Sequence, residues 1–230
     1  MKAADVMVTN VITVGPDACV QDVARTLLDA RISGVPVIGP KGELLGVVSE
    51  GDLMRRVEAG TGRRRPWWLA IFTDREVLAA EFIREHSRKV TDVMTRDVVT
   101  ASPDTPLSTI ANLLEKNAIK RVPIVKDGKI VGIVSRANLL QALASLSKKT
   151  DAVTAADDSK IRENVLTQLD AEPWTRPALI NVIVQDGTVE LWGIVDSVSE
   201  KKAVRVAAEV TPGVRAVNDN LIIRPAGSGY

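Results

Sequence analysis

Hydrophobic and polar positions follow the same order in two separate stretches of the chain. In residues 5–55 a short β-branched run, Val11–Val14, precedes an apolar stripe with helical spacing, and two further short apolar runs follow. The stripe predicts a helix and the runs predict strands, because apolar positions recur every three to four residues on a helix and every two on a strand. The residues of the stripe are Val20, Val23, Ala24, Leu27 and Leu28. This stretch is therefore predicted to fold as strand, helix, strand, strand and helix.

Residues 92–143 repeat this order. An offset of 87 positions relates the two stretches, beginning with Asp5-Val6-Met7 and Asp92-Val93-Met94. The offset falls to 86 after the second hairpin turn, where one residue is lost. A constant offset over about fifty residues indicates a duplicated structural unit. The matching positions include Thr13 with Thr100, Val35-Pro36 with Val122-Pro123, Ser49 with Ser135 and Leu53 with Leu139.

Each copy ends with a serine that stands three positions before a polar side chain. The pairs are Ser49 with Asp52 and Ser135 with Asn138. One interpretation is a capping box, in which each side chain satisfies a free backbone N–H of the first helical turn. The other is a ligand site, because a helix start attracts anions and a neighbouring carboxylate can hold a ribose diol. The two interpretations use the same geometry, and one hydroxyl can serve both.

The two stretches resemble a tandem pair of cystathionine-β-synthase (CBS) domains, the Bateman module. The resemblance rests on the paired threonines, the Val-Pro strands and the Gly-x-Val-Ser-x-x-Asp/Asn-Leu signature, and it covers about half of the chain. It implies two copies packed about a pseudo-two-fold axis, with two clefts for adenosyl ligands. In those clefts the signature residues hold phosphate and ribose, and the Val-Pro strands line the adenine pocket. The ligand-binding residues implied in this way are Thr13, Gly34, Val35, Pro36, Val37, Ser49, Asp52, Thr100, Lys120, Arg121, Val122, Pro123, Ile124, Ser135, Arg136 and Asn138.

The two copies differ at residues expected to meet the ligand. Asn138 stands where the first copy has Asp52, and an amide is a poorer acceptor for a ribose diol than a carboxylate. Lys120 and Arg121 precede the second Val-Pro step, and Arg136 follows the second serine. These three cations favour a phosphate in the second cleft, or else they form a solvated basic edge. The sequence therefore predicts that the first cleft binds ribose more tightly, by roughly tenfold or more if the walls of the two clefts are otherwise alike.

Residues 58–90, between the copies, form a basic and aromatic segment. Arg63-Arg64-Arg65 stands next to Trp67-Trp68, and arginines beside aromatic rings can bind nucleic acid by stacking on its bases. In the alternative interpretation the tryptophans pack against the protein while the arginines stay in water. We prefer this alternative because three arginines make a small electrostatic footprint, so nucleic acid is not an expected partner.

The C-terminal third of the chain predicts helix, strand, strand, helix and strand. Alternating apolar positions on both sides of Asp186-Gly187 predict a hairpin, and Pro212-Gly213 separates the second helix from the last strand. These residues resemble a BON domain, a small module often associated with envelope proteins and proposed to bind phospholipid. Lys201, Lys202 and Arg205 form either a solvated face or a contact with lipid head groups. We prefer the solvated face.

Composition narrows the class of function. The 230 residues are 45% hydrophobic and 26% charged, an ordinary balance for a globular protein. Thirty basic and 29 acidic residues leave a net charge of +1, which provides no bulk attraction to nucleic acid or membranes. With one cysteine, Cys19, and one histidine, His86, no Cys/His metal site is expected and a catalytic dyad is improbable. The lone cysteine and the polar N-terminus indicate a cytoplasmic protein.

The predicted fold class is α+β, with two CBS domains, each β-α-β-β-α, followed by an α-β-β-α-β BON domain. The predicted function is that of a regulatory sensor, without catalysis, metal or resident cofactor. An adenosyl ligand of the AMP, ATP, NAD or S-adenosylmethionine class binds in the clefts, and the BON domain is the output or docking module. The alternative is a ligand-free scaffold whose BON domain docks to a phospholipid membrane or a protein partner. A homodimer is expected, as is common in the CBS family. The predicted domains are CBS 1–57, a basic and aromatic linker with a helix in 58–90, CBS 91–146, linker 147–156 and BON 157–225.

Overall fold

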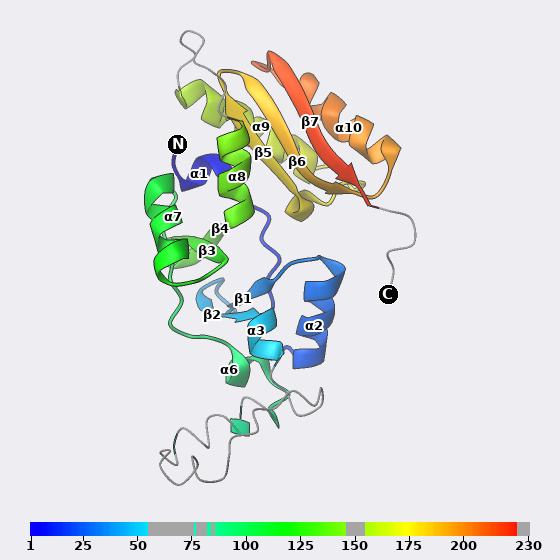
Figure 1. Ribbon diagram of the computed structural model, residues 1–230. Coiled ribbons are helices and arrows are strands. Elements are labelled where there is room, and N and C mark those ends of the chain that lie inside the picture. Colours follow the sequence, from blue (N-terminus) through cyan, green and yellow to red (C-terminus); the bar gives the residue numbers. More distant parts are fainter. Residues whose placement is uncertain (55–75, 77–81, 84–85, 146–154, 225–230) are drawn as a thin grey trace. The chain divides into compact units, whose positions relative to one another are not determined.

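The chain forms helices and three pairs or triplets of short strands (Figure 1). The computed structural model describes residues 1–54, 76, 82–83, 86–145 and 155–224. The basic and aromatic stretch Arg63–Trp68 lies outside these residues. The chain divides into two compact units. Unit 1 consists of Met1–Val11, Thr100–Lys126 and Val131–Tyr230, and unit 2 consists of Ile12–Val99 and Asp127–Ile130.

Unit 2 contains the hairpin and the signature helix of the first repeat. Strands β1 (Gly34–Ile38) and β2 (Leu44–Ser49) are antiparallel, and Gly42 turns between them with a φ of 81°, which glycine adopts without steric cost. The helices of the unit are α2 (Val20–Asp29), α3 (Glu50–Leu53) and α6 (Val90–Val93). Its core consists of Val20, Val23, Leu27, Val35, Val37, Val48, Val90, Val93 and Met94.

Unit 1 contains the corresponding elements of the second repeat. They are α7 (Leu107–Lys116), β3 (Arg121–Lys126), β4 (Lys129–Ser135) and α8 (Arg136–Ala144), and β3 pairs with β4. Helix α1 (Ala3–Val6) packs with them. The core consists of Ala3, Val6, Met7, Ile110, Leu114, Val122, Ile124, Val134, Ala142 and Ile183.

The sequence repeats and the compact units therefore divide the chain differently. Helix α1 opens the first repeat, yet Ala3 and Val6 lie in the core of unit 1 with the second repeat. Helix α6 opens the second repeat, yet Val90 and Val93 lie in the core of unit 2 with the first repeat. Each repeat contributes its leading helix to the core that is built around the other repeat.

A methionine after each leading helix explains the glycine at the start of each signature. A Cβ at Gly46 would lie 2.7 Å from Sδ of Met94, and a Cβ at Gly132 would lie 2.5 Å from Sδ of Met7. Gly46 and Met94 both belong to unit 2, and Gly132 and Met7 both belong to unit 1. The duplication seen in the sequence thus extends to the packing of side chains.

The first predicted strand of each repeat is shorter than expected. Instead of a strand at Val11–Val14, only Val14 forms a parallel bridge, with Val37, and Ala101 alone bridges Ile124. The N–H of Val14 donates to the carbonyl of Pro36 at 3.0 Å. The next rung would need an N–H from that proline, which proline lacks, so the ladder stops.

The C-terminal module, residues 155–224, is a three-stranded sheet with two helices packed against one face (Figure 1). Strand β5 (Ile180–Gln185) is antiparallel to β6 (Thr188–Val195), and β7 (Ala216–Ile223) is parallel to β6. The helices are α9 (Ala155–Asp170) and α10 (Val198–Glu209), and a short 3-10 turn, η2 (Pro177–Leu179), precedes β5. The predicted α+β class and the order of elements in this module are confirmed.

Candidate functional site

The first-repeat signature forms a hydrogen-bonded box at the start of α3. The backbone N–H and the hydroxyl of Ser49 both donate to Oδ2 of Asp52, at 2.8 and 2.7 Å. Within the part of the chain that the structure describes, Oδ1 of this carboxylate has no hydrogen-bond partner. Asp52 is half-buried. The capping interpretation accounts for Oδ2 of Asp52. Oδ1 can accept a hydrogen bond from a ligand.

Strand β1 lies directly beside this box. Gly34 is paired with Ser49 in the ladder. On the other edge of β1, Val14 bridges Val37, so that Thr13 lies next to the same strand. The predicted first-copy residues, which are distant in sequence, therefore come together within unit 2.

Four of the predicted ligand residues pack in hydrophobic cores. Val35 and Val37 have no exposed surface in unit 2, and Val122 and Ile124 have none in unit 1. Successive side chains of a strand point to opposite faces, so the proline between each pair of these residues points away from the core. These four side chains serve the core, and the prolines on the opposite face of each strand are buried as well.

The second-repeat signature forms the same box, but its amide points elsewhere. The N–H and the hydroxyl of Ser135 donate to Oδ1 of Asn138 at 2.8 and 2.7 Å. A carbonyl oxygen has two lone pairs, so these two bonds fill its accepting capacity. Nδ2 of Asn138 donates to Oε1 of Gln141 at 3.1 Å, and Asn138 is only 5% exposed. In this arrangement the second box has no free acceptor for a ribose hydroxyl.

The basic residues of the second repeat gather near the start of α8. The N–H of Arg136 donates to the carbonyl of Lys120 at 3.2 Å, and Arg121 opens β3. Lys120 and Arg136 are exposed, and Arg121 is half-buried. Thr100 is exposed and directly precedes the residue that bridges β3. The three cations predicted to favour a phosphate thus lie around β3 and α8 of unit 1, as does Thr100.

Gln141 and Asn181, which sequence reasoning missed, extend the second box into the C-terminal module. Nδ2 of Asn181 on β5 donates to the same Oε1 of Gln141 at 2.8 Å, and Asn181 is 4% exposed. Both residues belong to unit 1. The sequence held two signals for them. Gln141 stands three positions after Asn138, where helical side chains meet, and Asn181 is a polar residue inside an apolar strand.

Arg162 on α9 is a buried cation that joins the C-terminal module to the N-terminal segment. Nε donates to the carbonyl of Val182 at 2.7 Å, and Nη2 donates to the carbonyl of Met7 at 2.6 Å. Burial lowers the pKa of Arg162 to about 10, and the negative charge of Asp5 opposes this shift. The guanidinium therefore keeps its charge at neutral pH.

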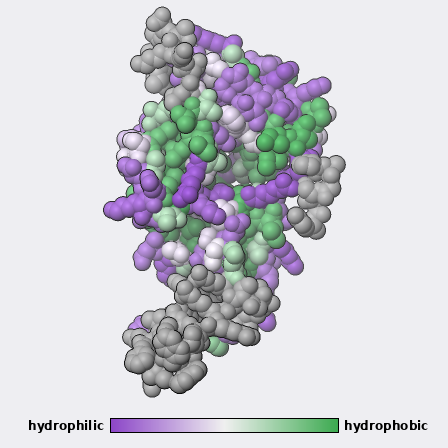
Figure 2. Space-filling model, viewed as in Figure 1, coloured by the Kyte–Doolittle hydropathy of each residue, from purple (hydrophilic) through white to green (hydrophobic). Residues whose placement is uncertain are grey.

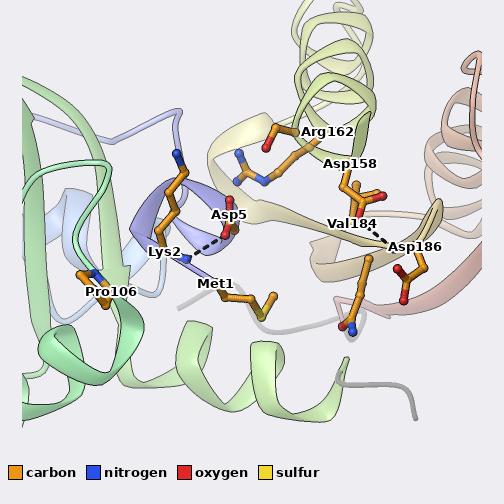
Figure 3. A pocket seen from close by; sticks show the side chains of 10 residues that line it. Met1, Lys2, Asp5, Pro106, Asp158, Arg162, Val184 and Asp186 are labelled. Carbon is orange, nitrogen blue, oxygen red and sulfur yellow. Dashed lines mark hydrogen bonds between the residues drawn. The ribbon is translucent and has the colours of Figure 1, made fainter. Parts of the chain in front are cut away.

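A cavity of about 610 Å³ adjoins this arginine, as Figure 3 shows. Its charged lining consists of Lys2, Asp5, Asp158, Arg162 and Asp186. The N–H of Lys2 donates to Asp5 at 2.8 Å, and the N–H of Asp186 donates to Asp158 at 2.8 Å. The lining mixes both signs of charge and satisfies much of its polarity internally, so it concentrates no charge for a ligand.

The basic residues of α10 are largely used within the module. Lys201 forms an ion pair with Asp219 at 3.3 Å, and Arg205 forms one with Glu209 at 3.4 Å. Lys202 is exposed. The solvated face stays a prediction.

Comparison with known families decides which family the chain belongs to. The CBS domain family matches residues 3–59 and 90–145, and the BON domain family matches residues 157–225. The chain is a tandem CBS-domain protein with a C-terminal BON domain. No described helix of this CBS–BON protein is both long enough and apolar enough to span a lipid bilayer.

Relatives of the CBS pair differ widely in their total length. The uncharacterized protein MJ1426 of Methanocaldococcus jannaschii is 36% identical over 133 residues, which are 53% of this chain and 79% of that protein. Inosine-5'-monophosphate dehydrogenase of the same organism is 30% identical over 141 residues, which are 61% of this chain but only 23% of the enzyme. The CBS–BON protein thus spans most of the first relative and under a quarter of the second.

A solved structure of CBSX2 in complex with AMP is similar to the CBS–BON protein. Its sequence is 27% identical, the TM-score is 0.56, and the match covers 64% of this chain and 99% of that chain. The match therefore leaves about a third of this chain uncovered.

Proposed function

We propose that this CBS–BON protein is a sensor that binds an adenosyl ligand in the clefts of its CBS pair. The ligand belongs to the class of AMP, ATP, NAD or S-adenosylmethionine. The observation that carries the proposal is Oδ1 of Asp52, which is half-buried beside Ser49 and β1 and has no hydrogen-bond partner among the described residues. The structure of CBSX2 in complex with AMP supports the class of ligand.

The chemistry of Asp52 suits a ribose. A carboxylate oxygen with both lone pairs available can accept from the two hydroxyls of a ribose diol. A hydrogen bond to a charged group contributes about 1.5–3 kcal/mol, compared with about 1 kcal/mol for a neutral one. Thr13 and Pro36 lie along the same strand edge and would contact the remainder of the nucleoside. The role is one of binding rather than catalysis, with the BON domain as the output.

The closed capping boxes favour a second candidate function, that of a ligand-free scaffold. In both boxes Ser49 and Ser135 are bonded to groups of the chain itself. The BON domain would then dock to a phospholipid membrane or to a protein partner. Co-sedimentation with anionic vesicles separates the two functions. Binding that is lost on deletion of residues 157–230 and is indifferent to nucleotide would favour the scaffold.

Thermal unfolding with millimolar AMP, ATP, NAD or S-adenosylmethionine tests the sensor directly. A ligand at one hundred times its Kd stabilises the folded state by about 2.7 kcal/mol. For a chain of this size that corresponds to a rise in Tm of roughly 5–10 °C. At least one of the four ligands is expected to produce such a rise, and the absence of a shift with all four would contradict the proposal.

We also propose that the protein is a homodimer. Figure 2 shows hydrophobic residues gathered over α8 and over α10 on the viewed face. In α8 the exposed ones are Leu140 and Leu143, which are 66% and 64% exposed. Covering such a helix face with a second copy removes apolar surface from water. Light scattering is expected to give about twice the 24.8 kDa of one chain, and a clean species of that single mass would contradict the dimer.

A further inference from the structure

Strand β5 of the BON sheet is covered on both faces within unit 1. Val182 and Val184 of β5 face the BON helices and lie in the core of the domain. Ile183, which points to the opposite face, has no exposed surface and lies in the core of the second CBS repeat. Trp192 of β6 packs against the same core. The BON domain is therefore docked on the second repeat by a sheet face.

One side-chain oxygen joins this docked face to the second signature. Oε1 of Gln141 accepts from Nδ2 of Asn138 at 3.1 Å and from Nδ2 of Asn181 at 2.8 Å. Oδ1 of Asn181 is buried and has no hydrogen-bond partner among the described residues. The bond to Gln141 is thus the one side-chain hydrogen bond that the structure gives Asn181.

We propose that ligand binding at the second CBS site and docking of the BON sheet oppose each other through Gln141. This inference rests on the proposed adenosyl-binding function. Oδ1 of Asn138 is already filled by two donors from Ser135, and Nδ2 is committed to Gln141. A ribose hydroxyl can engage this amide only if the side chain turns, because Asn138 is 5% exposed. When the side chain of Asn138 turns, Nδ2 no longer donates to Oε1 of Gln141. Gln141 is then less firmly positioned to accept the bond from Asn181.

The coupling is reciprocal, as any coupling between two binding equilibria must be. A ligand at the second site loosens the docked BON sheet, and a weaker dock makes the second site easier to fill. The size expected is about fivefold in affinity, which corresponds to one neutral hydrogen bond of about 1 kcal/mol. The second site would in this way report its occupancy to the BON domain. The first site, built on Asp52, has no such link among the residues of unit 2 that the structure describes.

The test uses the full chain with the first site disabled by Asp52→Ala, and AMP as the probe in calorimetry. Asn181→Ala is then added, because it removes the BON donor and leaves every residue of the CBS repeats unchanged. It is expected to tighten AMP binding about fivefold. The matched control is Asn218→Ala, which removes a bond to Glu190 inside the BON domain and is expected to leave the affinity unchanged within about twofold. Thermal unfolding of each variant checks that it is folded.

A second measurement follows the BON sheet itself. Hydrogen exchange of β5, residues 180–185, is expected to become faster when AMP saturates the Asp52→Ala protein. The inference is overturned if Asn181→Ala leaves the AMP affinity unchanged, if neither variant binds AMP, or if AMP binds and the exchange of β5 stays the same. If the natural sequence binds AMP in any of these three cases, the further inference is wrong but the proposed adenosyl-binding function is not contradicted. If none of the four adenosyl ligands binds the natural sequence, the proposed function itself fails.

Discussion

At the scale of residues, comparing Asp52 with Asn138 distinguishes helix capping from ligand binding, because both form the cap but only Asp52 offers an anionic oxygen. The Asn138 box shows that an asparagine keeps both bonds to its serine, at 2.8 and 2.7 Å. Asp52→Asn is therefore expected to preserve the cap, with Tm lowered by no more than about 2 °C. It removes the anionic oxygen, so the affinity for adenosine or AMP is expected to fall roughly tenfold. Calorimetry and thermal unfolding of the same variant measure the two effects.

Asn138→Ala is the matched variant in the second repeat. The first-repeat site, which contains Asp52, is expected to keep its affinity for AMP within about twofold, because Asn138 belongs to the other unit. A drop in Tm for Asp52→Asn with unchanged affinity would show that Asp52 is a cap only.

At the scale of elements, Arg162 ties helix α9 to β5 and to the N-terminal segment. Arg162→Met keeps most of the side-chain volume but leaves the carbonyls of Val182 and Met7 without their donor. An unsatisfied buried polar group costs about 1–3 kcal/mol, so the free energy of unfolding in urea is expected to fall by about 3 kcal/mol. Arg205→Met is the control, because Arg205 forms an exposed pair with Glu209, which contributes about 0.5 kcal/mol. Equal effects of the two substitutions would contradict the role given to Arg162.

At the scale of the whole molecule, the leading helices are exchanged between the repeats. Val6 and Val93 stand at the same repeat position and are buried in units 1 and 2, respectively. Each Val→Ala change removes two methyl groups and is expected to cost about 2 kcal/mol. Hydrogen exchange gives the location. Val6→Ala is expected to speed exchange in β3 and β4, and Val93→Ala in β1 and β2. The reverse assignment would show that each leading helix serves its own repeat.

The sequence by itself determined the duplication, the order of elements and the family. These follow from local rules, since periodicity, turn residues and the Ser-x-x-Asp/Asn spacing act over a few positions. Both boxes could be predicted for the same reason: Ser49 and Asp52 are three residues apart, and their bond depends only on a helix start. The difference between Asp52 and Asn138 as acceptors was also readable from residue type.

Only the tertiary structure decided which distant residues pack or form hydrogen bonds with one another. Periodicity identified Val6 and Val93 as apolar positions but could not assign them to a core, because the partner of a buried face is chosen by packing between distant segments. Gln141 and Asn181 stand forty positions apart, and Arg162 and Met7 stand 155 apart. No local pattern records such pairs. The shorter first strands have the same origin, since the missing N–H of Pro36 matters only once Val14 lies beside it.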